Sequence, residues 1–280
     1  MSKKLLLITL ISFSIFLVGC NSNQTDSTES TKPDVEQASD NSDKKEETNT
    51  QTDTMYSVKS ATYKQGNITI AYPEISGLKD TNKQSKINQL IKARALSISK
   101  DNSWGDELTL DIKYKITLQN KELLSVQYSG LSNVEKSAHP NNEFYTSNID
   151  ILNAKELTLS DFVTINSDFI KSFKSSTYIP WMTFDSKDEE KNLISALDEY
   201  KNTQLNDNDL LTWFKQSDKP DRNANISGVF CYLTKDSLGI RIDASHATGD
   251  HAEYEMKLNK IKNSLKTDNK AFKALLDSSK

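Results

Sequence analysis

Strict alternation of apolar and polar side chains is the clearest pattern in the chain. Between residues 107 and 119, apolar residues occupy the even positions and polar residues the odd ones. A period of two is typical of a β-strand with one buried face and one solvated face. The turn at 120–121 and the alternating residues Leu124, Val126 and Tyr128 predict a paired antiparallel strand.

Further elements surround this pair. We expect strands over 56–64 and 68–72, the second stopped by Pro73, and another strand over 144–151. Asp80 is a good N-cap, and the apolar residues of 87–98 follow it at helical spacing. The first half therefore predicts an antiparallel meander with one amphipathic helix on a face of the sheet.

The second half mixes helices and strands. Helices are expected after Ser167, from a capping box that starts at Ser186, and from a cap at Asp207 or Asn208. Alternating strands follow, and a last helix starts near Ile261; the expected strand ranges are 229–233, 238–242 and 254–258. We predict an α+β fold of antiparallel sheets with helices packed on one face, in two sequential subdomains, 56–165 and 166–280.

The N-terminal segment indicates where the protein works. Residues 1–19 combine two early lysines with an uncharged apolar run, and Cys20 follows directly. This pattern predicts a lipoprotein signal peptide, with Cys20 joined to lipid as the new N-terminus on the extracytoplasmic face of the membrane. Residues 20–55 are polar and acidic, which predicts a disordered tether with a typical span of about 30 Å.

Charge and cysteine content argue against two classes of protein, those that bind nucleic acid and those that disulfides stabilise. The net charge of the whole chain is −4, whereas residues 56–280 hold 30 basic and 30 acidic residues. A neutral body has no overall field to attract nucleic acid, so we expect no nucleic-acid partner. With Cys20 lipidated, Cys231 has no disulfide partner within the chain, and its alternating apolar surroundings favour a buried structural role.

The candidate chemistry lies around the three histidines. His246, Asp250 and His251 share a short segment, and His139 precedes the strand over 144–151. Two imidazoles and a carboxylate can hold a metal ion, but the spacing matches no known metal motif and the Gly249-Asp250 pair favours a polar turn. We expect no metal and no cofactor, and we assign His139, His246, Asp250 and His251 as candidate ligand-binding residues.

Trp181 is the remaining candidate. It lies in an aromatic loop that is either a contact patch, if exposed, or part of the core. The chain contains no nucleophile elbow, no P-loop and no dinucleotide fingerprint. We therefore expect no catalytic residues and no enzymatic activity.

Three groups of residues resemble a known extracellular domain. This domain is shared by RsiV-type anti-sigma factors and the N-terminal part of PdaC-type peptidoglycan deacetylases. The similar segments are 68–75 with 87–91, then 138–140 with Tyr145, 148–151 and 157–162, and finally 238–242 with 246–250 and 253–255. The resemblance implies a PdaC N-terminal-like domain over 56–165 and an RsiV C-terminal-like domain over 166–280.

The resemblance also suggests a function. We expect neither of the family's effectors, because only four residues precede the apolar run and the chain ends at Lys280. A non-enzymatic binding module for a cell-envelope ligand remains, and the RsiV-like part implies a lysozyme-type protein or peptidoglycan as that ligand. Two alternatives stay open: a metal-dependent enzyme that modifies the cell wall, and an assembly lipoprotein that binds another surface protein.

Overall fold

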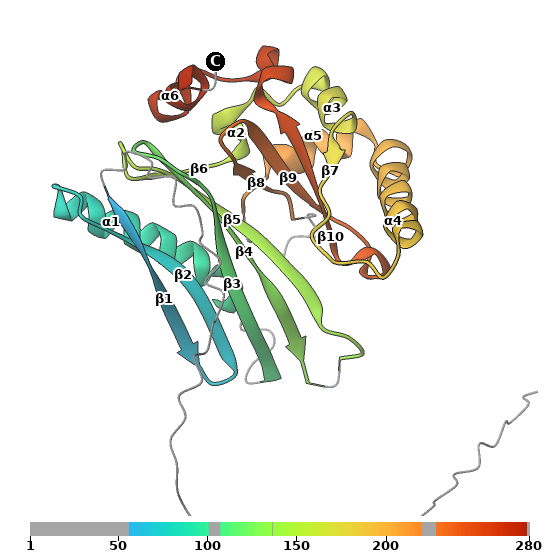
Figure 1. Ribbon diagram of the computed structural model, residues 1–280, viewed down its shortest axis with the longest axis horizontal. Helices are drawn as coiled ribbons and strands as arrows, with labels where there is room; N and C mark the ends of the chain where they lie inside the picture. The colour runs from blue at the N-terminus through green and yellow to red at the C-terminus, as the bar shows by residue number, and fades with distance from the viewer. Residues whose placement is uncertain (1–55, 101–106, 136, 220–227, 279–280) are drawn as a thin grey trace, which may run out of the picture. The chain divides into compact units, whose positions relative to one another are not determined.

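The strand pair at residues 107–128 forms the centre of a large sheet (Figure 1). The computed structural model describes residues 56–100, 107–135, 137–219 and 228–278. Its α+β fold confirms the expected class. The sheet order follows the chain, with strands β1 (Ser57–Gln65), β2 (Ile68–Ser76), β3 (Leu108–Gln119), β4 (Leu123–Val134), β5 (Asn141–Asp150) and β6 (Lys155–Leu157). Neighbouring strands are antiparallel except β2 and β3, so the sheet is mixed rather than purely antiparallel.

Pro73 does not stop the second strand, contrary to our expectation. β2 continues to Ser76 and keeps its register with β1 through Pro73. β2 pairs with β3 only at residues 68–70. One side of β2 therefore has no ladder partner at Pro73, and a proline is tolerated at such a place because no hydrogen bond is lost.

The second sheet has four antiparallel strands. Its order is β7 (Thr177–Tyr178), β10 (His251–Lys257), β9 (Ser237–Asp243) and β8 (Phe230–Leu233). The described residues of both sheets fall within one compact unit of the chain, residues 49–280. The boundary between subdomains at residue 165 stays a prediction, and the signal peptide and the tether lie outside the described residues.

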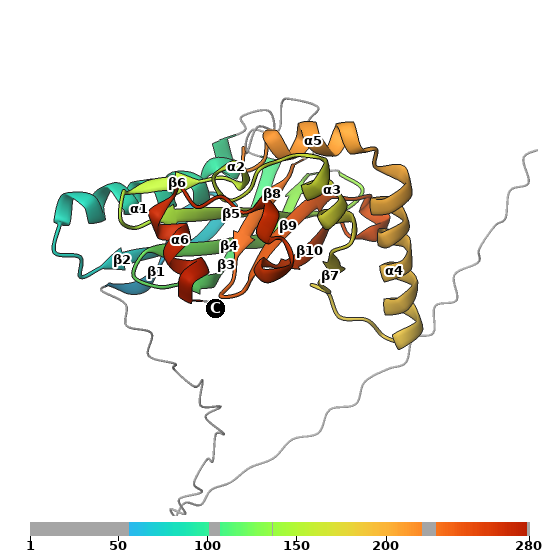
Figure 2. The same cartoon turned by 90° about the horizontal axis from the view of Figure 1, so that it is seen from above.

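In the described residues, six α-helices lie around the sheets: α1 (Thr81–Ala95), α2 (Leu159–Phe162), α3 (Ser167–Lys174), α4 (Lys187–Glu199), α5 (Asp207–Lys215) and α6 (Lys270–Ser278). α1 lies along the large sheet, as Figure 2 shows. Asp80 caps α1 and Ser186 caps α4, as predicted. The caps of α3 and α5 are Asn166 and Asn206, each earlier than expected, because each amide oxygen accepts the N–H three residues on. Within the described ranges, no helix is long and apolar enough to cross a membrane.

The prediction of a helix that starts near Ile261 is wrong. Residues 258–264 form two short 3₁₀ turns, and the last α-helix, α6, begins only at Lys270. The backbone here is held by another segment, because Thr164 N–H donates to Ser264 O at 2.8 Å and Lys266 N–H donates to Phe162 O at 2.8 Å. These bonds replace the intrahelical bonds that the apolar spacing suggested.

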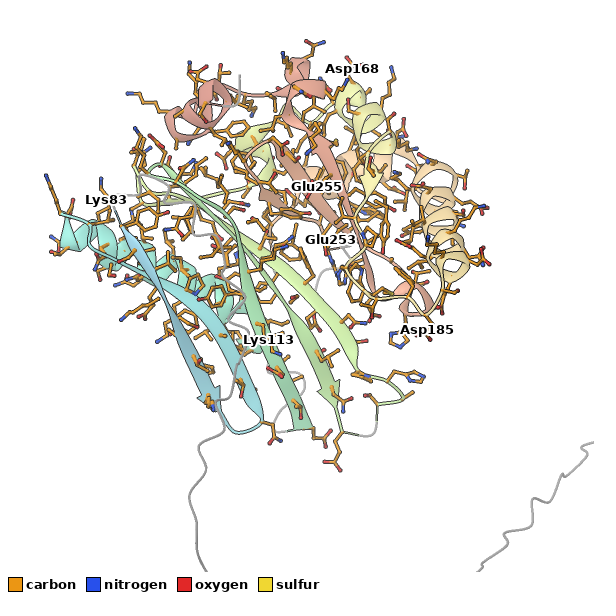
Figure 3. The ribbon with its side chains drawn as sticks, in the orientation of Figure 1. Lys83, Lys113, Asp168, Asp185, Glu253 and Glu255 are labelled. Carbon is orange, nitrogen blue, oxygen red and sulfur yellow. The ribbon has the colours of Figure 1, made fainter. Side chains whose placement is uncertain are left out.

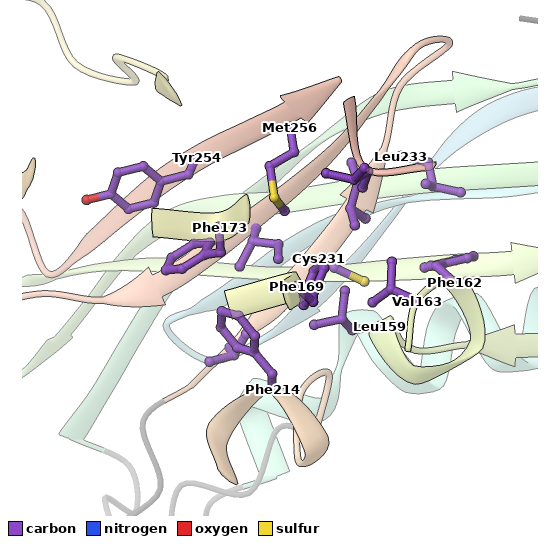
Figure 4. Close-up of a cluster of buried hydrophobic side chains, with 14 of the residues drawn as sticks. Leu159, Phe162, Val163, Phe169, Phe173, Phe214, Cys231, Leu233, Tyr254 and Met256 are labelled. Carbon is purple, nitrogen blue, oxygen red and sulfur yellow. The ribbon is translucent and has the colours of Figure 1, made fainter. Parts of the chain in front are cut away.

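Two hydrophobic cores follow from the alternation along the strands. One lies between α1 and the apolar face of the large sheet, where Tyr128 stacks on Tyr145 at 4.9 Å. The other lies between the small sheet and the helices of the second half (Figure 4). Its centre includes Phe173, whose ring meets Phe214 at 4.9 Å and Tyr254 at 5.4 Å.

The small sheet packs on the polar face of the large sheet through what we call the polar seam: Ser125, Thr146, Asn148 and the backbone of β8. Thr146 Oγ1 and Asn148 Nδ2 donate to the carbonyl of Cys231 at 2.6 and 2.8 Å. Leu233 N–H donates to Ser125 Oγ at 2.9 Å. β8 is an edge strand, so these side chains satisfy backbone groups that would otherwise lack ladder partners.

Asp218 joins the seam to the helices. Its carboxylate is buried and accepts backbone N–H groups from Cys231 and Leu159, each at 2.8 Å. Burial raises the pKa of Asp218, although both N–H donors act in the opposite direction. Cys231 is fully buried beside it, and burial raises the pKa of its thiol well above the ordinary value, as expected for a structural cysteine.

Candidate functional site

A cavity of about 750 Å³ lies between the two sheets next to the polar seam, and we call it the groove. One wall is the polar face of β3, β4 and β5, with Lys115, Gln127 and Ser129. The other wall is β10, and the segment Ile179–Trp181 borders it. The sequence predicts the polar face of residues 107–119 to be wet, and part of that face lines this groove instead of a flat surface.

The alternation along β10 places its polar residues in the groove. His251, Glu253 and Glu255 line the groove, whereas the residues between them belong to the core. Successive side chains of a strand point to opposite faces, so a polar residue at every second position produces one polar wall. Figure 3 shows Glu253 and Glu255 on the small sheet where it faces the large one.

Hydrogen bonds fix the two glutamates. Gln127 Nε2 donates to Glu253 Oε2 at 3.2 Å across the groove, and only 8% of the Glu253 side chain is exposed. The Tyr232 hydroxyl donates a hydrogen bond to Glu255 Oε1 at 3.3 Å. The Tyr232 ring passes so close to β9 that a Cβ at Gly239 would meet it at 2.1 Å, so only glycine fits there. Both carboxylates are therefore held by neighbours rather than freely rotating.

His251 is enclosed by aromatic rings. Its imidazole stacks on Trp181 with 4.4 Å between ring centroids and lies 5.3 Å from Phe144. Burial lowers the pKa of His251, and the nearby Glu253 carboxylate opposes this only in part. The imidazole is therefore neutral at pH 7. Trp181 is half-buried in this stack, between the two alternatives of an exposed patch and a core residue.

The other candidates form a cluster at the turn between β9 and β10. His139 stacks on His246 at 5.2 Å, and His246 Nδ1 contacts Asp250 Oδ1 at 2.7 Å. Asp250 Oδ2 accepts the backbone N–H of Asn142 at 2.8 Å. Burial opposes ionisation of Asp250, but the bonds from Asn142 and His246 outweigh it and lower the pKa of the carboxyl.

Gly249 connects this cluster to the groove. Its φ of +95° is in the left-handed region, and an added Cβ would meet Trp181 and Met182 at 2.7 Å. The polar turn expected at Gly249 and Asp250 is present, and it is pressed against the tryptophan. The structure thus gathers His139, His246, Asp250, His251 and Trp181 around one turn. Cys20 lies outside the described residues.

The geometry of the histidines favours hydrogen bonding over metal ligation. His139 and His246 meet face to face, and Asp250 already contacts His246 Nδ1. His251 belongs to a separate contact set, where its Nε2 lies 3.8 Å from Glu253. Within the part of the chain that the structure describes, no three such side chains converge as metal ligands would.

A second cavity of about 330 Å³ adjoins the first at residues 142–144. Arg241 and Asp243 line it and form an ion pair with each other. Arg241 Nη1 also donates to the carbonyl of Gly228 at 2.7 Å. This ion pair therefore belongs to the smaller of the two cavities, and the groove is the larger one.

Sequence reasoning missed the groove wall itself. Gln127, Arg241, Glu253 and Glu255 are not among the candidate residues that the sequence predicts. The signal was present in the order His251, Glu253, Glu255, because charges at alternate positions of a strand indicate a polar face. The partner wall could not be found this way, since it lies more than 100 residues away in sequence.

We expect the stability of the folded body to fall on mild acidification because of His251. The unfolded chain binds a proton near pH 6.5, whereas the folded imidazole, with its lowered pKa, binds one only at lower pH. Between these pH values the unfolded state holds more protons, so the free energy of unfolding drops as the pH falls. Urea unfolding of residues 49–280 at pH 7 and pH 5 measures this drop.

The exposed His139 provides the matched control. His251→Gln should reduce the difference in the free energy of unfolding between pH 7 and pH 5. His139→Gln should leave unchanged the part of this difference that His251 causes. An unchanged difference in His251→Gln would contradict this assignment.

Comparisons with known proteins give few matches. No family model matches the chain, and no curated protein matches it. Among solved structures, the chain is similar to a DUF3298 family member from Bacteroides fragilis, with 13% identity and a TM-score of 0.46 over 79% of this chain and 98% of that one. It is also similar to a DUF3298 family protein from Pseudomonas aeruginosa, with 13% identity and a TM-score of 0.42 over 76% and 95% of the two chains.

Proposed function

We propose that this protein is a lipid-anchored, extracytoplasmic binding module that holds a cell-envelope ligand in the groove and catalyses no reaction. The observation that carries the proposal is the groove itself. Trp181, His251 and Glu253 are held there in fixed positions between two sheets. Preorganised aromatic and polar groups in a concave site are typical of ligand recognition.

The resemblance to RsiV-type and PdaC-type domains makes the ligand more concrete. A lysozyme-type protein is the first candidate and peptidoglycan the second. The predicted signal peptide and the polar composition of residues 21–55 support display, because a lipid on Cys20 and about 35 polar residues would hold the body clear of the membrane. Acyl chains on the lipid, palmitate among them, would provide the attachment.

Retention assays test this function. Residues 49–280, the compact unit, are immobilised and incubated separately with lysozyme and with purified peptidoglycan. We expect one of the two to be retained, and Trp181→Ala to weaken retention about tenfold because the aromatic wall and the support of His251 are lost.

Trp213 offers the matched control. It is half-buried on α5 and is not among the residues that line the groove. Trp213→Ala should retain the ligand as well as the unaltered chain does. Retention of neither ligand, or equal losses in both tryptophan variants, would reject the proposed function.

A further inference from the structure

The groove carries a local charge that the neutral body does not. Among the described residues whose side chains face it, Glu253 and Glu255 are carboxylates and Lys115 is the one cationic side chain. Arg241 lies directly opposite Glu253 on the neighbouring strand and interacts with its charge, and it forms an ion pair with Asp243. The groove is therefore acidic, although residues 56–280 as a whole sum to zero.

The buried imidazole of His251, on the same wall, is a second and independent indication of a ligand site. The His251 imidazole lines the groove with only 2% of its side chain exposed, and its Nδ1 makes no hydrogen bond of standard geometry among the described residues, although the backbone of Asn142 is close enough to raise the pKa of the ring. Buried polar atoms are nearly always partnered, so such an atom at a cavity wall indicates a site for a polar group. Glu253, two residues on, is almost as deeply buried.

Apolar residues complete the lining. Ile179 and Leu131 line the groove, and 48% of Leu131 is exposed. An acidic site with apolar surroundings complements a side chain with a hydrocarbon stem and a charged head. A small metal ion or a neutral sugar would use only part of this lining.

We infer that the groove accepts the ammonium or guanidinium group of a lysine or arginine side chain from a basic protein. The inference rests on the proposed function that the groove holds the envelope ligand. Glu253 and Glu255 receive the charged head, and Trp181 adds a face for a cation–π contact. The aliphatic stem lies against Ile179, and Leu131 contacts the surface of the partner.

Binding of a fluorescent hexalysine peptide to residues 49–280 tests the inference. This chain omits most of the acidic tether, which would attract hexalysine without any groove. We expect binding that weakens with added salt, that is absent for fully acetylated hexalysine, and that falls about tenfold in the double variant Glu253→Gln and Glu255→Gln. Glu199→Gln, an exposed carboxylate on α4, should bind like the unaltered chain.

Three results would overturn the inference. They are equal binding of native and acetylated hexalysine, equal losses in Glu199→Gln and in the double variant, and binding of de-N-acetylated glycan in place of hexalysine. Glu255→Gln alone, checked by circular dichroism, keeps the test valid should the double variant fail to fold.

The test separates the two proposals. Hexalysine binding without retention of lysozyme or peptidoglycan would reject the proposed function and leave the cation site standing. Retention that Trp181→Ala weakens, without any hexalysine binding, would reject the cation site and leave the proposed function standing.

Discussion

Replacing Asp218 with alanine is expected to lower the free energy of unfolding by about 3–5 kcal/mol. Asp218 is buried, and its carboxylate accepts the backbone N–H groups of Cys231 and Leu159. Alanine would leave both donors buried without partners. The backbone at this position has a φ of +62°, in the left-handed region. Alanine is less favourable there than aspartate, whose short polar side chain can form local hydrogen bonds.

Asp218→Asn separates the two causes. Asparagine tolerates the same backbone conformation and keeps one acceptor oxygen, so it should lose clearly less stability than alanine. Asp168→Ala, at an exposed carboxylate of α3, should change stability by less than about 1 kcal/mol. Urea unfolding of residues 49–280 gives all three values. A loss at Asp218→Ala no larger than at Asp168→Ala would contradict the role of Asp218 at the polar seam.

Replacing Cys20 with serine is expected to abolish lipid labelling of the full chain. A hydroxyl does not replace the thiol on which a lipoprotein signal peptide depends, so no acyl group would be attached. The measurement is metabolic labelling of cells with an alkyne analogue of palmitate, followed by capture of the protein. The label should disappear completely.

Cys231 serves as the internal control. It is buried in the core, so Cys231→Ser should keep the full label although it perturbs packing. Label that persists in Cys20→Ser, or that disappears in Cys231→Ser, would argue against an anchor at Cys20.

The local pattern predicted much of the fold. The period of two over residues 107–119 and the N-caps at Asp80 and Ser186 all correspond to observed elements, although the Glu189 carboxylate accepts the N–H of Asp185 and so does not complete the capping box expected at Ser186. These features depend on neighbours in sequence, where steric and hydrogen-bonding rules act directly. The same reasoning failed at Ile261, where pairing with residues 162–164 replaced the expected helix.

The candidate site was predicted only in part. His139 and His246 could be singled out separately, but their stacking depends on the packing of two distant loops. The acidic wall was visible in the alternation of β10, whereas the groove depends on β10 facing β4 across more than 100 residues of chain. A single sequence carries no local signal for such a pairing.

Hydrogen–deuterium exchange tests the central claim, that the groove is the ligand site, most directly. Residues 49–280 are measured alone, with saturating lysozyme and with soluble peptidoglycan fragments. The account predicts added protection in β10 and in residues 179–181 with one of these ligands, and no change in α4. Protection confined to surfaces outside the groove, or no protection with either ligand, would contradict it.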